Sequence, residues 1–206
     1  CTTADTSIAA GEALIFNQRV EGQNIQRLTA TSTSTQAFTL SFYAKSNASR
    51  AIASEINFSN GTNKQMSKLH TIGTSWARYT MTVPAASSTQ IDDDNSHELS
   101  INFWLHAGST YTGGTLNDDA LDSITNANRA AGIGSIFAST DNFFEITGVQ
   151  LELGSTATDF EHRSFEEEFA ECRRYFYKIQ AATTYMKFGM GRAWSTDDMA
   201  CALYLP

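Results

Sequence analysis

Hydrophobic and polar residues alternate with a period of two over much of the first 155 residues. In residues 38–45, for example, Phe38, Leu40 and Phe42 point to one face, and Thr39, Ser41 and Tyr43 point to the other. Such alternation is typical of strands that bury one face. It predicts further strands at 52–58, 79–83, 99–105 and 143–153, and shorter ones at 13–16, 24–28 and 65–72. Because turn clusters rather than helices separate these strands, the pattern favours an antiparallel jelly-roll β-sandwich.

The period changes to that of a helix after Ser164. Ser164 and Glu167 have the spacing of a capping box, and acidic residues fill the first turn as the helix dipole favours. Apolar side chains recur on one face, at Phe165, Phe169, Cys172 and Phe176. We expect a short amphipathic helix whose apolar face docks against the sandwich or a neighbouring subunit.

Three polar residues, Glu161, His162 and Arg163, stand directly before this helix. We expect them to order the turn by hydrogen bonding, with Arg163 paired with Glu161. Strand-like patterns return at 183–189 and 199–205 and predict the start of a second β domain. The expected organisation is an N-terminal connecting segment, a jelly-roll β-sandwich, a linker helix and a truncated C-terminal β domain, at 1–11, 12–160, 161–180 and 181–206.

The charge and the cysteines narrow the classes of function. The formal net charge of −8 disfavours nucleic-acid binding, and no apolar run is long enough to cross a bilayer. Cys1, Cys172 and Cys201 lack the spacing of zinc or redox sites. We expect free thiols and folding in a reducing bacterial cytoplasm. The absence of an initiator Met suggests a piece of a longer protein.

No catalytic residues are predicted. The acidic residues cluster in turns and in the first turn of the helix, where solvation and the helix dipole explain them, and there is no G-x-S-x-G motif. Asp92, Asp93 and Asp94 are a weak candidate for Ca²⁺, with a polar loop as the alternative. We therefore expect no cofactor and, apart from that weak candidate, no metal.

Aromatic side chains offer the best candidate for binding. Alternation points Phe103 inward, so the opposite face of the same strand carries Asn102, Trp104 and His106, with Tyr111 shortly after. Sugars stack on exposed aromatic rings, so these four residues are the predicted carbohydrate contacts. The alternative is that the long segment 107–142, or a neighbouring subunit, covers Trp104. A segment of this length is usually functional or stabilised by its own packing.

Several runs resemble a sandwich module of tail-fibre and other virion structural proteins of tailed bacteriophages. The strand ending Ile146-Thr147-Gly148-Val149-Gln150-Leu151-Glu152, with Gly154, is similar to the family's "ITGVQLE-G". It is followed, as in the family, by Ala157, Thr158, Phe160, Glu161, His162, Arg163, Glu167, Glu168, Cys172, Arg174 and Tyr175. Residues 17–22, 38–46 and 105–111 also resemble family stretches, whereas Asp118 replaces a Trp common in the family.

The resemblance implies a non-enzymatic virion protein, made in the host cytoplasm and often part of an oligomeric fibre. We expect a homotrimer that contacts other virion proteins and, through the sandwich, host surface polysaccharide. A purely architectural spacer or head decoration is the alternative, and a polysaccharide depolymerase is a remote one. A monomer in analytical ultracentrifugation of the full-length protein would contradict the trimer.

Overall fold

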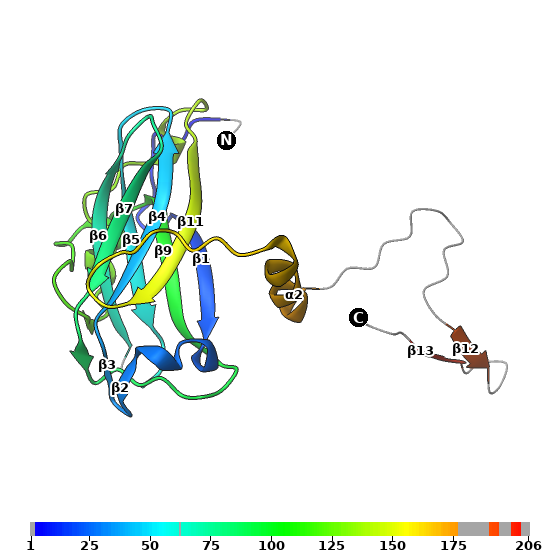
Figure 1. Cartoon of the computed structure of the whole chain (residues 1–206). Helices are drawn as coiled ribbons and strands as arrows, with labels where there is room; N and C mark the ends of the chain where they lie inside the picture. Colours follow the sequence, from blue (N-terminus) through cyan, green and yellow to red (C-terminus); the bar gives the residue numbers. More distant parts are fainter. Residues whose placement is uncertain (1–2, 62, 177–189, 194–198, 203–206) are drawn as a thin grey trace. The chain divides into compact units, whose positions relative to one another are not determined.

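The structure, a computed structural model, describes residues 3–61, 63–176, 190–193 and 199–202. The fold is mainly β, with antiparallel sheets and a short helix. The chain divides into two compact units, Cys1–Phe160 and Glu161–Pro206. The first unit contains two main sheets and is called the two-sheet body below (Figure 1).

The larger sheet of the two-sheet body has five strands in the order β1-β9-β5-β6-β10. Every neighbouring pair in it is antiparallel. Only β5 and β6 are consecutive in the chain, so most pairings join distant segments. The strands are β1 (Ala13–Glu21), β5 (Arg50–Phe58), β6 (Lys64–Ile72), β9 (His97–Ala107) and β10 (Asp122–Ser123).

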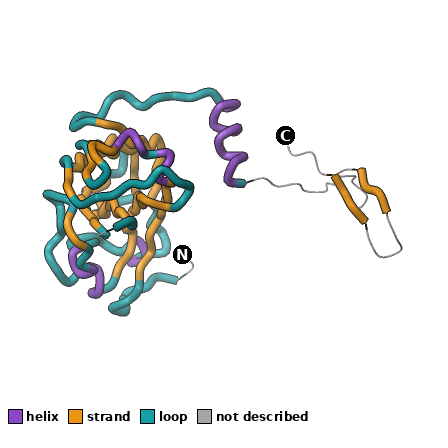
Figure 2. The backbone as a smooth tube through the Cα atoms, turned by 90° about the horizontal axis from the view of Figure 1, so that it is seen from below, coloured by secondary structure: helices purple, strands orange, loops and turns teal. Residues whose placement is uncertain are grey.

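The second main sheet has three antiparallel strands in the order β11-β4-β7 (Figure 1). They are β4 (Phe38–Ser46), β7 (Ala77–Val83) and β11 (Phe144–Leu153). As expected from its missing N–H donor, Pro84 directly follows the last residue of β7. A small third sheet is formed by β2 (Thr29–Thr31), β3 (Ser34–Thr35) and β8 (Ala86–Ser87). Loops and turns run around the strands of this unit (Figure 2).

The hydrophobic core lies between the two main sheets. Phe42 of β4 meets Phe103 of β9 edge to face, with ring centroids 4.9 Å apart, and Phe38 meets Phe58 in the same manner at 6.2 Å. These four side chains are at most 2% exposed. The strands around Phe42 and Phe103 therefore supply facing layers of the core.

The predicted strand at 24–28 is wrong. The chain forms two 3₁₀ turns there, η1 (Gly22–Asn24) and η2 (Gln26–Leu28), which bracket Ile25. Ile25 and Leu28 are both buried in the core. In a strand, residues three apart point to opposite faces, whereas in a 3₁₀ turn they lie on the same side. Burial of both side chains thus favours the turns.

Strand β11 contains a β-bulge. The register of β11 against β4 shifts between Thr147 and Gln150. Within the bulge, Gly148 has a φ of +57°, and a Cβ there would lie 3.0 Å from Cδ2 of Tyr43. Glycine is favoured at this position because it tolerates the left-handed conformation and the close ring.

After β11 the chain turns back across the outer face of the three-stranded sheet (Figure 1). Hydroxyl groups of two sheet residues hold it, since Thr39 donates to the Gly154 carbonyl at 2.8 Å and Thr82 to that of Ser155 at 3.2 Å. Arg78 donates to the carbonyl of Thr158. We call residues 154–160 the strap. The contacts of the strap give Gly154 and Thr158 a structural role.

Glu152 fixes the strap from the end of β11. Its carboxylate accepts hydrogen bonds from the backbone and the hydroxyl of Thr158, the latter at 2.8 Å, and from the side chain of Gln150. Burial alone would raise the pKa of Glu152, but these hydrogen bonds outweigh it and lower that pKa. The hydrogen bonds thus favour the ionised form of Glu152, which anchors the strap.

Buried His70 should make the protein less stable at acidic pH. Its Nε2 lies 2.8 Å from Oγ of Ser54, and its ring packs edge to face on Phe42. Burial, with Lys68 as a smaller cause, lowers the pKa of His70 from 6.5 to about 4. The unfolded chain therefore takes up a proton in a pH range where the folded chain stays neutral. We expect the free energy of unfolding to fall by roughly 3 kcal/mol as the pH falls between those two values.

Urea unfolding of the wild type and of His70→Gln, measured between about pH 4 and 7, checks this expectation. Carboxylates that titrate in the same range act equally in both proteins, so the difference between them isolates His70. The variant should lose distinctly less stability on acidification. Parallel pH profiles would contradict the assignment.

The second unit contains α2 (Phe165–Tyr175) and a hairpin of β12 (Met190–Ala193) and β13 (Met199–Ala202). The predicted capping box is confirmed, with Ser164 Oγ accepting from the Glu167 amide at 3.3 Å. Arg163 forms an ion pair with Glu171 at 2.9 Å, because the helix brings Glu171 within its reach, and its pairing with Glu161 stays a prediction. The strand predicted at 183–189 lies outside the described residues.

The predicted apolar face of α2 is formed in part, since Phe176 follows the last helical residue and has an extended backbone. The rings of Phe165 and Phe169 stack with centroids 5.6 Å apart, and Cys172 is a free thiol. The docking partner of this face stays a prediction. Among the described helices, none combines the length and the apolar composition that a membrane crossing requires.

Candidate functional site

Three of the four predicted carbohydrate contacts, Asn102, Trp104 and Tyr111, come together. Asn102, Trp104 and His106 alternate along β9 on the face of the five-stranded sheet that points away from the core. Tyr111 lies in the short helix α1 (Ser109–Thr112), and its ring is 5.1 Å from that of Trp104. The period-two pattern thus placed these residues on one face correctly.

This face is covered, however, and the exposed sugar platform is wrong. Trp104 is 0% exposed, and Asn102 and His106 are nearly as buried. Trp104 packs with Ala53, Ala107 and Ala130 in a second hydrophobic cluster, which Tyr111 and Ile133 complete. The long segment after β9 folds over the ring, as the alternative reading of the sequence expected.

A buried carboxylate organises the covered face. Glu55 of β5 is 0% exposed, and its Oε2 accepts hydrogen bonds from Asn102 Nδ2 and Trp104 Nε1, each at 2.8 Å. Its Oε1 accepts from Arg129 Nε at 2.7 Å, and Arg129 Nη2 reaches Oε2 at 3.0 Å. We call Glu55, Asn102, Trp104 and Arg129 the Glu55 cluster.

Arg129 is the link between this cluster and the long segment. Its guanidinium also lies over the Trp104 ring, 4.9 Å from the centroid. Next to it along the chain, η3 (Asn126–Asn128) is joined to the start of the segment, since Gly114 N donates to the Ala127 carbonyl at 2.9 Å. Arg129 therefore fixes the segment as well as filling the site above Trp104.

The same segment forms a polar cavity beside the sheet, with a volume of ≈ 280 Å³. It is called the loop cavity below. Its lining combines three amides, three hydroxyls, one carboxylate and one leucine: Gln65, Asn117, Asn128, Thr115, Ser123, Thr125, Asp122 and Leu116. Such a lining offers many hydrogen-bond donors and acceptors and little apolar surface.

One residue of the lining has a buried side-chain amide without a hydrogen-bond partner for its nitrogen. The side chain of Gln65 accepts from Ser67 Oγ at 3.1 Å, but its amide nitrogen has no hydrogen-bond partner within the described part of the chain. Gln65 is only 1% exposed. Leaving a buried donor unsatisfied costs about 1–3 kcal/mol, so such a group calls for a water molecule or a ligand.

The backbone around the loop cavity is well tied. Asn117 donates through Nδ2 to the Gln65 carbonyl at 2.7 Å, and Ser67 N donates to the Asn117 carbonyl at the same distance. Asn128 Oδ1 accepts from Thr115 N at 3.2 Å. The walls are therefore set by hydrogen bonds between the segment and β6.

The weak calcium candidate has another explanation. Asp92 accepts hydrogen bonds from Gln90 at 2.7 Å and Asn60 at 2.8 Å, which together lower its pKa. Both carboxylate oxygens of Asp94 accept from Ser96. These donors belong to the protein itself and account for the carboxylates as parts of a polar loop, while the calcium candidate stays a prediction.

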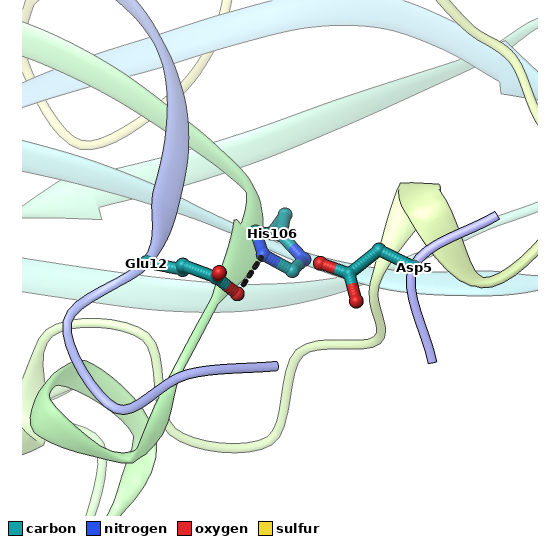
Figure 3. Close-up of side chains that lie close together, drawn as sticks. All are labelled: Asp5, Glu12 and His106. Carbon is teal, nitrogen blue, oxygen red and sulfur yellow. Dashed lines mark ion pairs between the residues drawn. The ribbon is translucent and has the colours of Figure 1, made fainter. Parts of the chain in front are cut away.

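A different group of potential metal ligands was missed from the sequence. Asp5, Glu12 and His106 each offer one ligand atom, and these atoms lie within 4.8 Å of one another. Figure 3 shows both carboxylate side chains pointing at the His106 ring. The residues are far apart in the sequence, so no local spacing could indicate them.

Comparisons with protein-family models, with curated proteins and with solved structures give no match. Function must therefore be inferred from the chain's own residues and geometry. Of the predicted contacts, Asn102 and Trp104 belong to the Glu55 cluster, Tyr111 packs on it, and His106 belongs to the metal-ligand group. The loop cavity is lined by none of them.

Proposed function

We propose that the chain is a structural component of a bacteriophage tail fibre or a related virion appendage, with lectin-like recognition of host glycans. Its two-sheet body is then a jelly-roll β-sandwich. Two observations support that architecture: the chain crosses from one main sheet to the other between β4 and β5 and returns between β6 and β7, and most strand pairs join distant segments. The family resemblance supports the virion assignment.

The observation that carries glycan recognition is the loop cavity with the unused amide of Gln65. Sugars present dense arrays of hydroxyl groups, each able to donate and accept. A lining of amides, hydroxyls and the Asp122 carboxylate matches that chemistry. A turn of the Gln65 side chain toward the cavity would let its unpaired Nε2 donate to a hydroxyl group of a bound sugar.

The Glu55 cluster has an indirect role in this proposal. It holds Arg129, and the neighbouring residue Asn128 lines the loop cavity. Trp104 and Asn102 are thus positioning residues that keep one cavity wall in place. In this proposal the carbohydrate contacts are Gln65 and Asp122 rather than the four residues named from the sequence.

Assembly and location complete the proposal. We propose a homotrimer that contacts other virion proteins and lies in an external appendage of the particle. The architectural alternative keeps the same fold and position but has no ligand. In the remote depolymerase alternative, the chain would cut the polysaccharide that it binds.

Glycan binding is tested with an array of bacterial lipopolysaccharides and capsular polysaccharides. The wild-type protein should retain at least one of them. Gln65→Met keeps the side-chain volume but removes the amide donor, and Asp122→Asn keeps the shape but removes the charge. Each substitution is expected to weaken retention at least about tenfold, because a lost polar contact in a sugar site leaves its partner unpaired.

Asp92→Asn is the matched control for Asp122→Asn. It removes a carboxylate from another loop, so retention should stay at the wild-type level. If no glycan is retained by the wild type, the architectural alternative is correct. Release of reducing ends from a retained polysaccharide would instead favour the depolymerase.

A further inference from the structure

We propose that Asp5, Glu12 and His106 bind a divalent transition-metal ion of the Zn²⁺ class at the end of β9. The three ligand atoms lie within 4.8 Å of one another, and Nε2 of His106 is 3.7 Å from Oε2 of Glu12. That separation is too long for a hydrogen bond. Zinc ligands bound at about 2.0–2.1 Å would lie roughly 3.3 Å apart in tetrahedral geometry, so the ligand atoms would close by up to about 1.5 Å on binding.

The burial and the hydrogen bonding of His106 suit a metal ligand. The residue is 2% exposed, its ring packs 5.0 Å from that of Phe137, and Nδ1 lies 2.7 Å from Ser135 Oγ. When Nδ1 donates to the serine oxygen, the lone pair of Nε2 is available on the side of the Glu12 carboxylate, 3.7 Å away. Metal-bound histidines commonly use their other nitrogen in this way, which fixes the orientation of the ring.

The two carboxylates are also held in place. Glu12 Oε2 accepts from Ala9 N at 2.8 Å, and Asp5 Oδ1 accepts from Ser7 N at 3.0 Å. The backbone N–H of Asp5 donates to the carbonyl of Phe137 at 2.8 Å, beside the His106 ring. Both acidic side chains point at the imidazole from the N-terminal segment (Figure 3).

The ligand chemistry selects the ion. Two carboxylates balance the charge of a divalent cation, and one imidazole nitrogen favours Zn²⁺ or a similar transition metal over Ca²⁺ and Mg²⁺, which prefer oxygen ligands. Three protein ligands leave a coordination position for water. Glu12 is partly exposed, with 43% of its side chain accessible, so an ion can enter from solvent.

The consequence of binding is structural. The ion would join the N-terminal segment to the end of β9 and to η4 (Ile136–Ala138), which the segment already touches. An ion bound by the folded state and not by the unfolded one raises the unfolding temperature. The proposal does not depend on glycan recognition.

The test is calorimetric titration of the full chain, freed of metal with a chelator, with ZnCl₂. We expect one saturable site in the wild type and a rise in its unfolding temperature. Glu12→Gln and Asp5→Asn preserve shape and should each weaken Zn²⁺ binding at least about tenfold. His97→Gln, which removes another histidine of β9, is the matched control and should bind as the wild type does.

Cobalt distinguishes this site from the cysteine thiols. Co²⁺ bound here should show visible absorption without the thiolate-to-metal charge-transfer band, and Ca²⁺ in excess should not displace it. The proposal is overturned if the wild type shows no saturable binding, if the charge-transfer band appears, if Ca²⁺ displaces the ion, or if Glu12→Gln binds Zn²⁺ unchanged. Unfolding curves recorded without metal show that each variant is folded.

Discussion

Glu55→Ala should lower the free energy of unfolding of the two-sheet body by roughly 3–5 kcal/mol. The substitution leaves the Arg129 guanidinium, only 18% exposed, without its carboxylate partner. It also removes the acceptor for Trp104 Nε1 and Asn102 Nδ2. Removing one member of a buried ion pair is costly because the other charge remains desolvated. Urea unfolding at neutral pH measures the loss.

A matched surface pair provides the control. Glu145→Ala removes the partner of Lys45, an ion pair of 3.1 Å whose side chains are 28% and 48% exposed. That substitution should cost less than about 1 kcal/mol. The double variant Glu55→Ala/Arg129→Ala should lose less stability than the sum of the losses in the two single variants, because both substitutions remove the same interaction. Strict additivity would contradict the Glu55 cluster.

Trp104→Ala should destabilise the protein by about 3–5 kcal/mol, the usual cost of removing a buried aromatic side chain. Trp104 is 0% exposed, and its ring contacts the Tyr111 ring and the Arg129 guanidinium. Its removal leaves a cavity beneath the long segment and frees Arg129 from its stacking partner. We therefore also expect faster proteolytic cleavage within residues 108–138, measured by limited digestion of the folded protein.

Trp76→Ala is the control for this substitution. Trp76, which directly precedes β7, is 47% exposed, and Lys45 Nζ lies 5.2 Å from its ring centroid. Its removal should cost about 1 kcal/mol or less and leave the digestion pattern unchanged. Equal losses for the two tryptophans would show that Trp104 is not part of a packed cluster. If Trp104→Ala loses glycan binding and Trp76→Ala keeps it, the loss comes from displacement of the long segment, because Trp104 itself does not line the loop cavity.

The main strands could be predicted because their pattern is local. Alternation in β4, β5, β7, β9 and β11 depends on one buried face, and a capping box depends on residues only three apart. The strand predicted at 24–28 is wrong for a related reason, because a local pattern does not show what the side chains pack against. Ile25 and Leu28 are both apolar, but their spacing fits a 3₁₀ turn, and only the core that receives them decides between turn and strand.

The candidate site was harder to predict because it depends on contacts between distant segments. Alternation assigns Glu55 to the outward face of β5, where a charged residue would ordinarily be solvated. Nothing near it in the sequence shows that Arg129 covers it. Likewise, the loop cavity joins Gln65 of β6 to residues of the segment after β9. The sequence predicted coverage of Trp104 by the long segment only as an alternative.

The strand pairings also impose an order on folding. Ala13 of β1 pairs with Ala107 of β9, and Phe38 of β4 pairs with Leu153 of β11. A chain that grows from its N-terminus therefore completes the central pairings only after most of the two-sheet body has been synthesised. Contacts between such distant segments slow folding and leave strand edges unpaired in the meantime. The β5–β6 hairpin, whose strands are adjacent in the chain, is the part that can form first and receive β9 when it arrives.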